Sequence, residues 1–498
     1  MRLPVKDRFI IPVVLLCLIL SGAVSCKKDS LNTDPSAKIE LSQDSLLFDT
    51  VFSTIGSATK NIRIRNKNSQ RIKISSINLE GGSASQFIVN VDGVPGTSFK
   101  DIELAAKDSM YIFIQVNVNP TNQNSPLIIN DRLVFSVNGN IQYLNLEAWG
   151  QDAYYHRPTN AIKFKDGSYL PYSRISENDN AVVTWIKDKP HVIYGYLAVD
   201  STQKLIINAG VRVYFNYKAG LWVYRYGELQ VKGQKGNEVI FQGARREKDY
   251  ADEPGQWDRI WINEGSNNNS IDYAIIKNAY VGLQAEVFGN TIGLPGRLKL
   301  TNTKIQNMSL WGLYALAYNI YGGNNVISNC QEHSLNILLG GKYTFLHCSF
   351  SNFWSKDKSR DKSTVNISNY TESQVLPMDS CYFGNCIIDG TLDNELVLDV
   401  KSSGTTVPHY TFSSCWIRSN SDLSDASLYP DVRKGSSALE YKDIGAYDFE
   451  TKDDEARIKG FNSSRAVGDA GKFPFDINQK SRSASISNGS ISAGAFDK

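Results

Sequence analysis

The feature that most restricts the fold is a long series of very short β-rich runs in the second part of the chain. From residue 205 onward, runs of three to five apolar or β-branched residues recur with Gly or Asn between them, for example at 205–207, 229–231, 239–241, 298–300 and 396–398. No stretch has the 3.6-residue periodicity of a long amphipathic helix. In strands this short, the backbone N–H and C=O groups find hydrogen-bond partners best when each strand pairs with the equivalent strand of the next turn of chain. The pattern therefore predicts a solenoid.

The size and class of this solenoid also follow from the pattern. With about 22 residues per coil, residues 205–416 would form about nine or ten coils of a parallel β-helix. A propeller is the competing all-β fold, but it predicts a period of about 40–50 residues, which we do not find. The chain has 25 Tyr against 4 Met, a composition that favours strands over helices. We therefore predict an all-β protein with a β-helix over residues 160–498.

A different strand pattern covers residues 37–152. Segments such as 61–65, 111–116 and 133–137 alternate apolar and polar residues with a period of two, which is typical of strands with one buried face. Asn138-Gly139 between two such runs is a strong hairpin signal. Seven or so short strands in this length predict an Ig-like β-sandwich. We expect this module to act as a spacer or docking platform and not as an active site.

The N-terminus has the pattern of a secretory signal. Basic residues are followed by an apolar run from Phe9 to Leu20, which is too short to span a bilayer as a helix. Small residues then lead into Cys26, as in a bacterial lipoprotein box, although Ala23-x-Ser25 would also suit ordinary signal cleavage. The sequence thus predicts a signal peptide over 1–25, lipidation at Cys26 and a polar tether over 26–36. The expected location is the outer membrane of the cell envelope, where the lipid would hold the protein on the inner or the cell-surface side.

Charge excludes one class of partner. The whole chain has a formal charge of +2, and removal of Arg2, Lys6, Asp7 and Arg8 with the signal leaves 50 basic and 50 acidic residues. A balanced chain lacks the long-range attraction that nucleic acid binding requires. Walker loops, HExxH and CxxC motifs are also absent from the sequence.

Five cysteines fall within one region of the solenoid: Cys330, Cys348, Cys381, Cys386 and Cys415. An odd number cannot all pair, and each follows a polar residue, which indicates small buried thiols at equivalent places in successive coils. A zinc site would need histidines with paired spacing, which the neighbouring sequence lacks.

Several segments resemble a known family. Residues 185–199, 205–211 and 228–233, the Pro254-Gly255-Gln256-Trp257 loop and the segments 444–447 and 464–471 look like the coils and closing segments of right-handed parallel β-helix lipoproteins of Bacteroidetes. The first module is similar to Ig-like domains of the ASPM/SPD-2/Hydin type. The resemblance implies a right-handed β-helix with a C-terminal closing segment on an exported protein. It implies no activity, because members of the family are mostly uncharacterised.

Aromatic residues near the start of the β-helix form the candidate binding site. The candidate ligand platform comprises Trp222, Tyr224, Tyr226, Trp257 and Trp261. Aromatic faces on a long β surface can stack on sugar rings while Asn and Asp side chains bind hydroxyl groups. Large aromatic residues at the end of a solenoid also serve to cap its core, and the sequence leaves both interpretations open.

Carboxylates offer a weaker hypothesis. Asp389, Asp393 and Glu395 form an acidic group in which Asp393 and Glu395 would share one side of a strand, and calcium binding is conceivable there. Solvated loop charges are the alternative. Asp453-Asp454 and Arg457-Ile458-Lys459 match pieces of polygalacturonase motifs, but they lie close together after the coils and the chain has no Gly-His-Gly, so we interpret the match as coincidence.

The functional expectation is a lipid-anchored envelope protein without catalysis. Its β-helix would present a binding or scaffolding surface to a polysaccharide or to another envelope protein, with no resident cofactor. The alternative is a polysaccharide lyase or glycoside hydrolase that acts in a groove of the β-helix. Fold alone does not decide between them.

Overall fold

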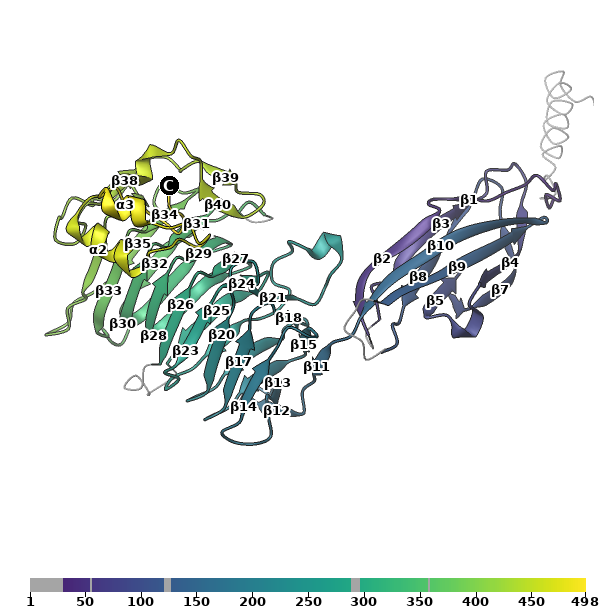
Figure 1. Ribbon diagram of the computed structural model, residues 1–498. Coiled ribbons are helices and arrows are strands. Elements are labelled where there is room, and N and C mark those ends of the chain that lie inside the picture. The colour runs from purple at the N-terminus through teal and green to yellow at the C-terminus, as the bar shows by residue number, and fades with distance from the viewer. Residues whose placement is uncertain (1–29, 54–55, 121–126, 288–295, 357–358) are drawn as a thin grey trace, which may run out of the picture. The chain divides into compact units, whose positions relative to one another are not determined.

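The chain divides into two compact units, residues 1–151 and 152–498. The computed structural model (Figure 1) describes residues 30–53, 56–120, 127–287, 296–356 and 359–498. The predicted signal peptide and Cys26 therefore lie outside the described residues. None of the helices in the described ranges combines the length and hydrophobicity that a membrane span requires.

The first unit is an Ig-like β-sandwich of two five-stranded sheets. One sheet has the order β1 (Glu40–Leu41), β3 (Lys60–Arg65), β8 (Ser109–Val116), β5 (Phe87–Val91) and β6 (Val94–Gly96). The other has the order β2 (Ser45–Phe52), β10 (Asn140–Gln151), β9 (Leu127–Val137), β4 (Ile72–Leu79) and β7 (Ser98–Leu104). The described residues thus contain more strands than the seven predicted.

The predicted hairpin at Asn138-Gly139 is confirmed. Val137 of β9 pairs with Asn140 of β10, and both turn residues have positive φ, 47° and 85°, as a two-residue hairpin turn requires. Within the predicted polar tether, residues 30–36 lie in the described part of the chain and contact the sandwich. Leu31 bridges to Arg71, and the Asn138 side chain donates to the backbone oxygen of Asn32 at 2.8 Å, so this segment is bound to the sandwich.

The second unit is a parallel β-helix with three sheets, A, B and C, each containing one strand or half-strand from successive coils. Sheet A contains β13 (Tyr169–Arg174), β16 (Tyr196–Val199), β19 (Gly220–Val223), β22 (Ile260–Ile262), β25 (Val281–Glu286), the first halves of β28 (Trp311–Gly323) and β30 (Leu335–Leu346), β32 (Val365–Ser368) and β35 (Leu396–Asp399). Sheet B contains β14 (Val182–Trp185), β17 (Lys204–Asn208), β20 (Glu228–Lys232), β23 (Asn269–Asp272), β26 (Arg297–Thr301), the second halves of β28 and β30, β33 (Met378–Gly384) and β36 (Tyr410–Ser413). Sheet C contains β11 (Tyr154–His156), β15 (His191–Ile193), β18 (Arg212–Phe215), β21 (Val239–Gly243), β24 (Ala274–Lys277), β27 (Lys304–Met308), β29 (Val326–Cys330), β31 (Ser349–Asn352), β34 (Ile387–Gly390), β37 (Trp416–Arg418) and β38 (Arg433–Gly435).

The predicted length of about 22 residues per coil holds for some coils and is wrong for others. In sheet A, Leu313 pairs with Leu335 of the next coil, whereas Leu221 pairs with Ile260, which lies much further along the chain. The longer coil contains an insertion between β21 and β22. The corners of the coils thus vary in length, while the strands that they connect remain in register.

The interior of the β-helix is filled by side chains that stack from coil to coil. One column in sheet A consists of Leu197, Leu221, Ile260, Leu283, Leu313, Leu335, Val365 and Leu396, each paired in register with the next. Every member is buried. Burial of a Leu or Ile side chain contributes about 1.5–3 kcal/mol, so such columns are a main source of stability.

A second ladder runs along the corner between sheets B and C. It consists of Thr303, Asn325, Cys348, Cys386 and Cys415, each of which directly precedes a sheet C strand. Neighbouring members are joined by hydrogen bonds, including one from the Cys348 backbone N–H to the Cys386 sulfur at 3.5 Å and one from Cys386 to Cys415 at 3.3 Å. The residue before each member has a positive φ of 49° to 54°, which forms the sharp corner.

The five cysteines are buried and unpaired, as predicted. Equivalent positions are confirmed for Cys348, Cys386 and Cys415, whereas Cys330 ends β29 and Cys381 lies within β33. Burial raises the pKa of the Cys330 thiol to about 12 and that of Cys386 well above its usual value. Burial thus disfavours the reactive thiolate form of Cys330 and Cys386, and both act as packing groups.

The C-terminal segment packs on the outer face of sheet C at the last coils. It contains β39 (Tyr441–Asp443), β40 (Asp448–Thr451), α2 (Ser464–Lys472) and α3 (Ser483–Ser487), which appear in yellow beside the last coils in Figure 1. Its apolar residues, among them Leu439, Phe461 and Phe496, pack with Val326, Ile387 and Trp416 of sheet C. The Arg457 side chain forms an ion pair with Glu455 at 2.6 Å within this segment. The structural role of Arg457 is therefore to stabilise the C-terminal segment.

Candidate functional site

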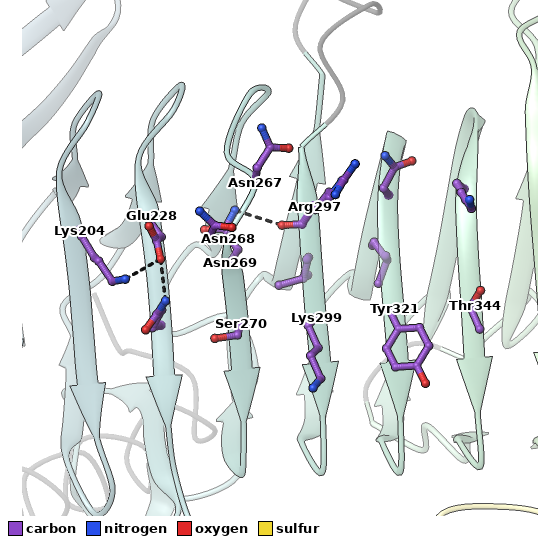
Figure 2. Close-up of a pocket in the computed structure, with 15 residues that line it drawn as sticks. Lys204, Glu228, Asn267, Asn268, Asn269, Ser270, Arg297, Lys299, Tyr321 and Thr344 are labelled. Atoms are coloured by element: carbon purple, nitrogen blue, oxygen red, sulfur yellow. Dashed lines mark hydrogen bonds and ion pairs between the residues drawn. The ribbon is translucent and has the colours of Figure 1, made fainter. Parts of the chain in front are cut away.

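The outer face of sheet B carries a groove with a volume of about 920 Å³. It crosses β17, β20, β23, β26, β28 and β30, which Figure 2 shows side by side. Its lining consists of Lys204, Glu228, Gln230, Asn267, Asn268, Asn269, Ser270, Arg297, Leu298, Lys299, Asn319, Ile320, Tyr321, Lys342 and Thr344. Most of these side chains are amides, hydroxyls or cations.

Strand register arranges the lining into two rows across the strands. In the first row Lys204 pairs with Glu228, and Arg297 pairs with Asn319, which pairs with Lys342. The second row contains Gln230, Ser270, Lys299, Tyr321 and Thr344, each paired with the next. Apolar neighbours such as Leu298 and Leu300 point into the core, so the period of two along each strand directs the polar members outward.

The electrostatics differ along the groove. At one end Lys204 forms an ion pair with Glu228 at 2.8 Å, and Gln230 donates to the same carboxylate at 2.6 Å. Arg297, Lys299 and Lys342 are exposed, and in the described part of the chain none of the three has a carboxylate within ion-pair distance. Because Glu228 is the single carboxylate among the described lining residues, the groove carries a surplus of positive charge.

Asn269 fixes the corner beside the groove. Its side-chain oxygen accepts from the Leu229 backbone N–H at 2.9 Å, and its amide donates to the backbone oxygens of Ser266 and Arg297 at 3.1 and 3.3 Å. These bonds join three successive coils and hold Asn267 and Asn268 at the rim, as Figure 2 shows. The hydrogen bonds of Asn269 therefore fix the backbone that carries the Asn267 and Asn268 side chains at the rim of the groove.

Tyr321 supplies an aromatic surface within the groove. Its side chain is 36% exposed, and its ring is stacked on Phe473 at 6.1 Å between centroids. Burial raises the pKa of the Tyr321 hydroxyl, which therefore stays protonated and can donate a hydrogen bond at neutral pH.

The structure brings together only part of the predicted ligand platform. Trp222, Tyr224 and Trp261 form a cluster on the outer face of sheet A, with the two indole rings stacked at 5.2 Å. Trp222 is only 7% exposed, and its indole N–H donates to Asn263 at 2.6 Å, so most of its surface is already covered. Tyr226 is exposed at a neighbouring corner, where its ring lies against Gly265.

Trp257 does not belong to the platform, and its inclusion was wrong. It is 1% exposed inside the β-helix, where its ring is stacked on Phe215 at 4.1 Å and its N–H donates to the Lys277 backbone oxygen at 2.9 Å. It lies in the segment between β21 and β22, outside any strand, so the alternation of strand residues does not indicate which way it points.

Polar groups close to the sheet A cluster are engaged with one another. Trp261 and Gln284 donate to the Glu286 carboxylate at 2.6 and 2.5 Å, and burial raises the pKa of Glu286. Tyr196 donates to Asp258, which also forms an ion pair with Arg259. The outer face of sheet A is thus a closely packed network here, in contrast to the open groove of sheet B.

The calcium hypothesis does not fit the structure. Asp393 and Glu395 lie in the turn before β35 and not on a strand, and their side chains have separate partners. Glu395 is buried and forms a bidentate ion pair with Arg360, which is 1% exposed, whereas Asp393 is 85% exposed. Asp389 accepts hydrogen bonds from the Leu439 backbone and the Tyr441 hydroxyl, each at 2.9 Å. Burial raises its pKa to about 7.

No three Asp, Glu, His or Cys side chains come together as a metal site would need in the residues that the structure describes. Asp389 instead binds the C-terminal segment, Glu395 pairs with Arg360, and Asp393 is exposed beside Arg418.

Sequence reasoning missed the groove residues. Arg297 and Lys299 flank Leu298 in an alternating run, which predicts that they point outward. That Asn319 and Lys342 lie beside them depends on the register between coils of unequal length, for which the sequence contains no direct signal.

Comparisons with known proteins leave the function open. No protein-family model matches the chain, and no curated protein matches it. A PapD-like domain of human CEP192 is 14% identical, with 26% of this chain and 95% of that chain covered and a TM-score of 0.16. The E. coli chaperone DraB is 8% identical over 27% of this chain and 80% of its own, with a TM-score of 0.17.

A family 123 glycoside hydrolase from Clostridium perfringens is 9% identical over 28% of this chain and 26% of its own length, with a TM-score of 0.17. These likenesses are too weak to support an argument about activity.

The buried Arg360–Glu395 pair generates a prediction. Glu395→Gln leaves the Arg360 charge without its counter-ion, so we expect the free energy of unfolding to fall by about 3–5 kcal/mol. Asp393→Asn, two residues away but exposed, should change it by less than about 0.5 kcal/mol. Urea unfolding followed by tryptophan fluorescence measures both. Equal effects of the two variants, or stabilisation of the wild type by added calcium, would contradict this role.

Proposed function

We propose that this protein binds an extended polysaccharide, without cleaving it, in the groove of sheet B. The observation that carries the proposal is the groove itself, which runs across six parallel strands and presents amides, hydroxyls, cations and one tyrosine ring. Amide and hydroxyl side chains match the hydrogen-bonding groups of sugars, and an aromatic ring offers a face for stacking. A long groove across coils suits a polymer better than a compact metabolite.

The chemistry of the lining favours binding over hydrolysis. Glycoside hydrolysis ordinarily uses two carboxyl groups that flank the scissile bond. Among the described lining residues the groove has Glu228 alone, and its carboxylate is engaged by Lys204 and Gln230.

The second candidate function is a polysaccharide lyase, and the proximity of Lys299 to Tyr321 in one row favours it. A lyase needs a base that abstracts a proton α to a carbonyl, and cations that stabilise the resulting charge. The raised pKa of Tyr321 makes its hydroxyl a poor base at neutral pH. Binding without cleavage therefore remains the leading proposal.

The proposal places the protein in the cell envelope. Its basis is the lipoprotein-like segment before Cys26 and the resemblance to β-helix lipoproteins of Bacteroidetes. In this arrangement the lipid at Cys26 holds the protein in the outer membrane, the Ig-like module acts as a spacer, and the β-helix presents the groove to a polysaccharide. Another envelope protein is the alternative partner.

Binding and cleavage are separated by one experiment on the purified processed protein. We expect soluble polysaccharides to bind with no increase in reducing ends or unsaturated products. Tyr321→Ala should weaken binding by about 1 kcal/mol, roughly fivefold, because it removes the stacking face. Tyr217→Ala is the matched control, since Tyr217 is 71% exposed and lies outside the groove. Equal binding by both variants would refute the role of Tyr321, and product formation would favour the lyase.

The anchor is tested in cells. Radioactive palmitate should label the wild-type protein and not the Cys26→Ala variant, because acylation requires the Cys26 thiol. Cys17→Ala, within the predicted signal, is the control and should still be labelled. An unlabelled wild-type protein would contradict lipidation at Cys26.

A further inference from the structure

The positive charge of the groove is unevenly distributed, and this points to the class of polysaccharide. The Lys204 charge at one end is neutralised by Glu228 at 2.8 Å. Arg297 and Lys299 on β26 and Lys342 on β30 remain exposed without an ion pair in the described part of the chain. The chain as a whole is close to neutral, so three unpaired cations in one groove are a local feature.

Arg297 and Lys342, the two cations of the first row that are not paired with Glu228, have a defined spacing. Arg297 pairs in register with Asn319, and Asn319 pairs with Lys342, so one neutral amide lies between two charges. Neighbouring strands are about 4.8 Å apart, which places the Arg297 and Lys342 backbones about 10 Å apart along the axis of the β-helix. Two pyranose residues of an extended chain cover a similar length.

Resting on the proposed function, we infer that the groove selects an acidic polysaccharide that carries an anionic group on every second sugar and lies along the β-helix axis. Arg297 and Lys342 bind successive anionic groups, and Asn319 binds the hydroxyls of the neutral sugar between them. Guanidinium binds a carboxylate or sulfate through two parallel hydrogen bonds, and ammonium binds it as a point charge. Lys299, in the second row of the same strand as Arg297, adds to the local positive potential.

The inference is tested with three probes of equal length: hyaluronan oligosaccharides, with a carboxylate on alternate sugars; oligogalacturonate, with one on every sugar; and neutral cello-oligosaccharides. We expect the alternating probe to bind most tightly to the processed full-length protein. A tenfold rise in salt concentration should weaken the binding of both acidic probes and leave any neutral binding unchanged. A desulfated and a sulfated chondroitin distinguish carboxylate from sulfate as the anion.

Substitutions in the first row test whether its side chains bind the acidic probe. Arg297→Gln and Lys342→Gln should each weaken binding of the alternating probe about tenfold, because each removes a charge-assisted hydrogen bond. Asn319→Asp places a negative charge between the two cations and should weaken acidic binding at least as much. Lys165→Gln, at an exposed turn outside the groove, is the matched control and should bind like the wild type. Circular dichroism confirms that each variant is folded.

The outcomes separate the inference from the proposed function. Neutral probes that bind as tightly as acidic ones, with no loss in the Arg297 and Lys342 variants, would overturn the inference and leave polysaccharide binding intact. Equal affinity for the alternating and the fully charged probe would overturn the spacing argument. Absence of binding by any polysaccharide would overturn the proposed function together with the inference.

Discussion

The backbone hydrogen-bond ladder between parallel strands of successive coils is the interaction on which the rest of the structure depends. It fixes the register of each strand against the next, so the aliphatic column from Leu197 to Leu396 stacks inside while polar side chains align outside. A slip of one residue would exchange the two faces, which the buried columns prevent. The same register therefore builds both the core and the groove.

The corners between strands can vary in length because the hydrogen-bond ladder requires only that the strands of successive coils stay in register. The insertion between β21 and β22 lengthens one coil without breaking the pairing of β19 with β22. The ladder from Thr303 to Cys415 holds one corner in line, and the C-terminal segment covers the last strands of sheet C. Sheet B keeps an open outer face in the groove, and that face carries Arg297, Lys299 and Lys342.

Local patterns predicted the parts of the structure that depend on local chemistry. Asn138-Gly139 indicated a hairpin because only a few residue pairs tolerate its turn, and the short apolar runs indicated a stacked β-helix. Trp257 was misplaced because it lies outside any strand, and Glu395 was misinterpreted because its partner Arg360 lies in another turn of chain. The alignment of Arg297, Asn319 and Lys342 depends on register between coils of unequal length, which a single sequence does not specify.

The register is tested most directly by a distance across the groove. Spin labels on cysteines introduced at Lys204 and Lys342 would lie in one row of sheet B, and the five buried native thiols should remain unlabelled. From β17 to β30 there are five strand spacings, so electron–electron resonance should give one narrow distance, with backbones about 24 Å apart. A broad distribution, or a mean far from five spacings, would contradict the stacked register and with it the alignment of the groove.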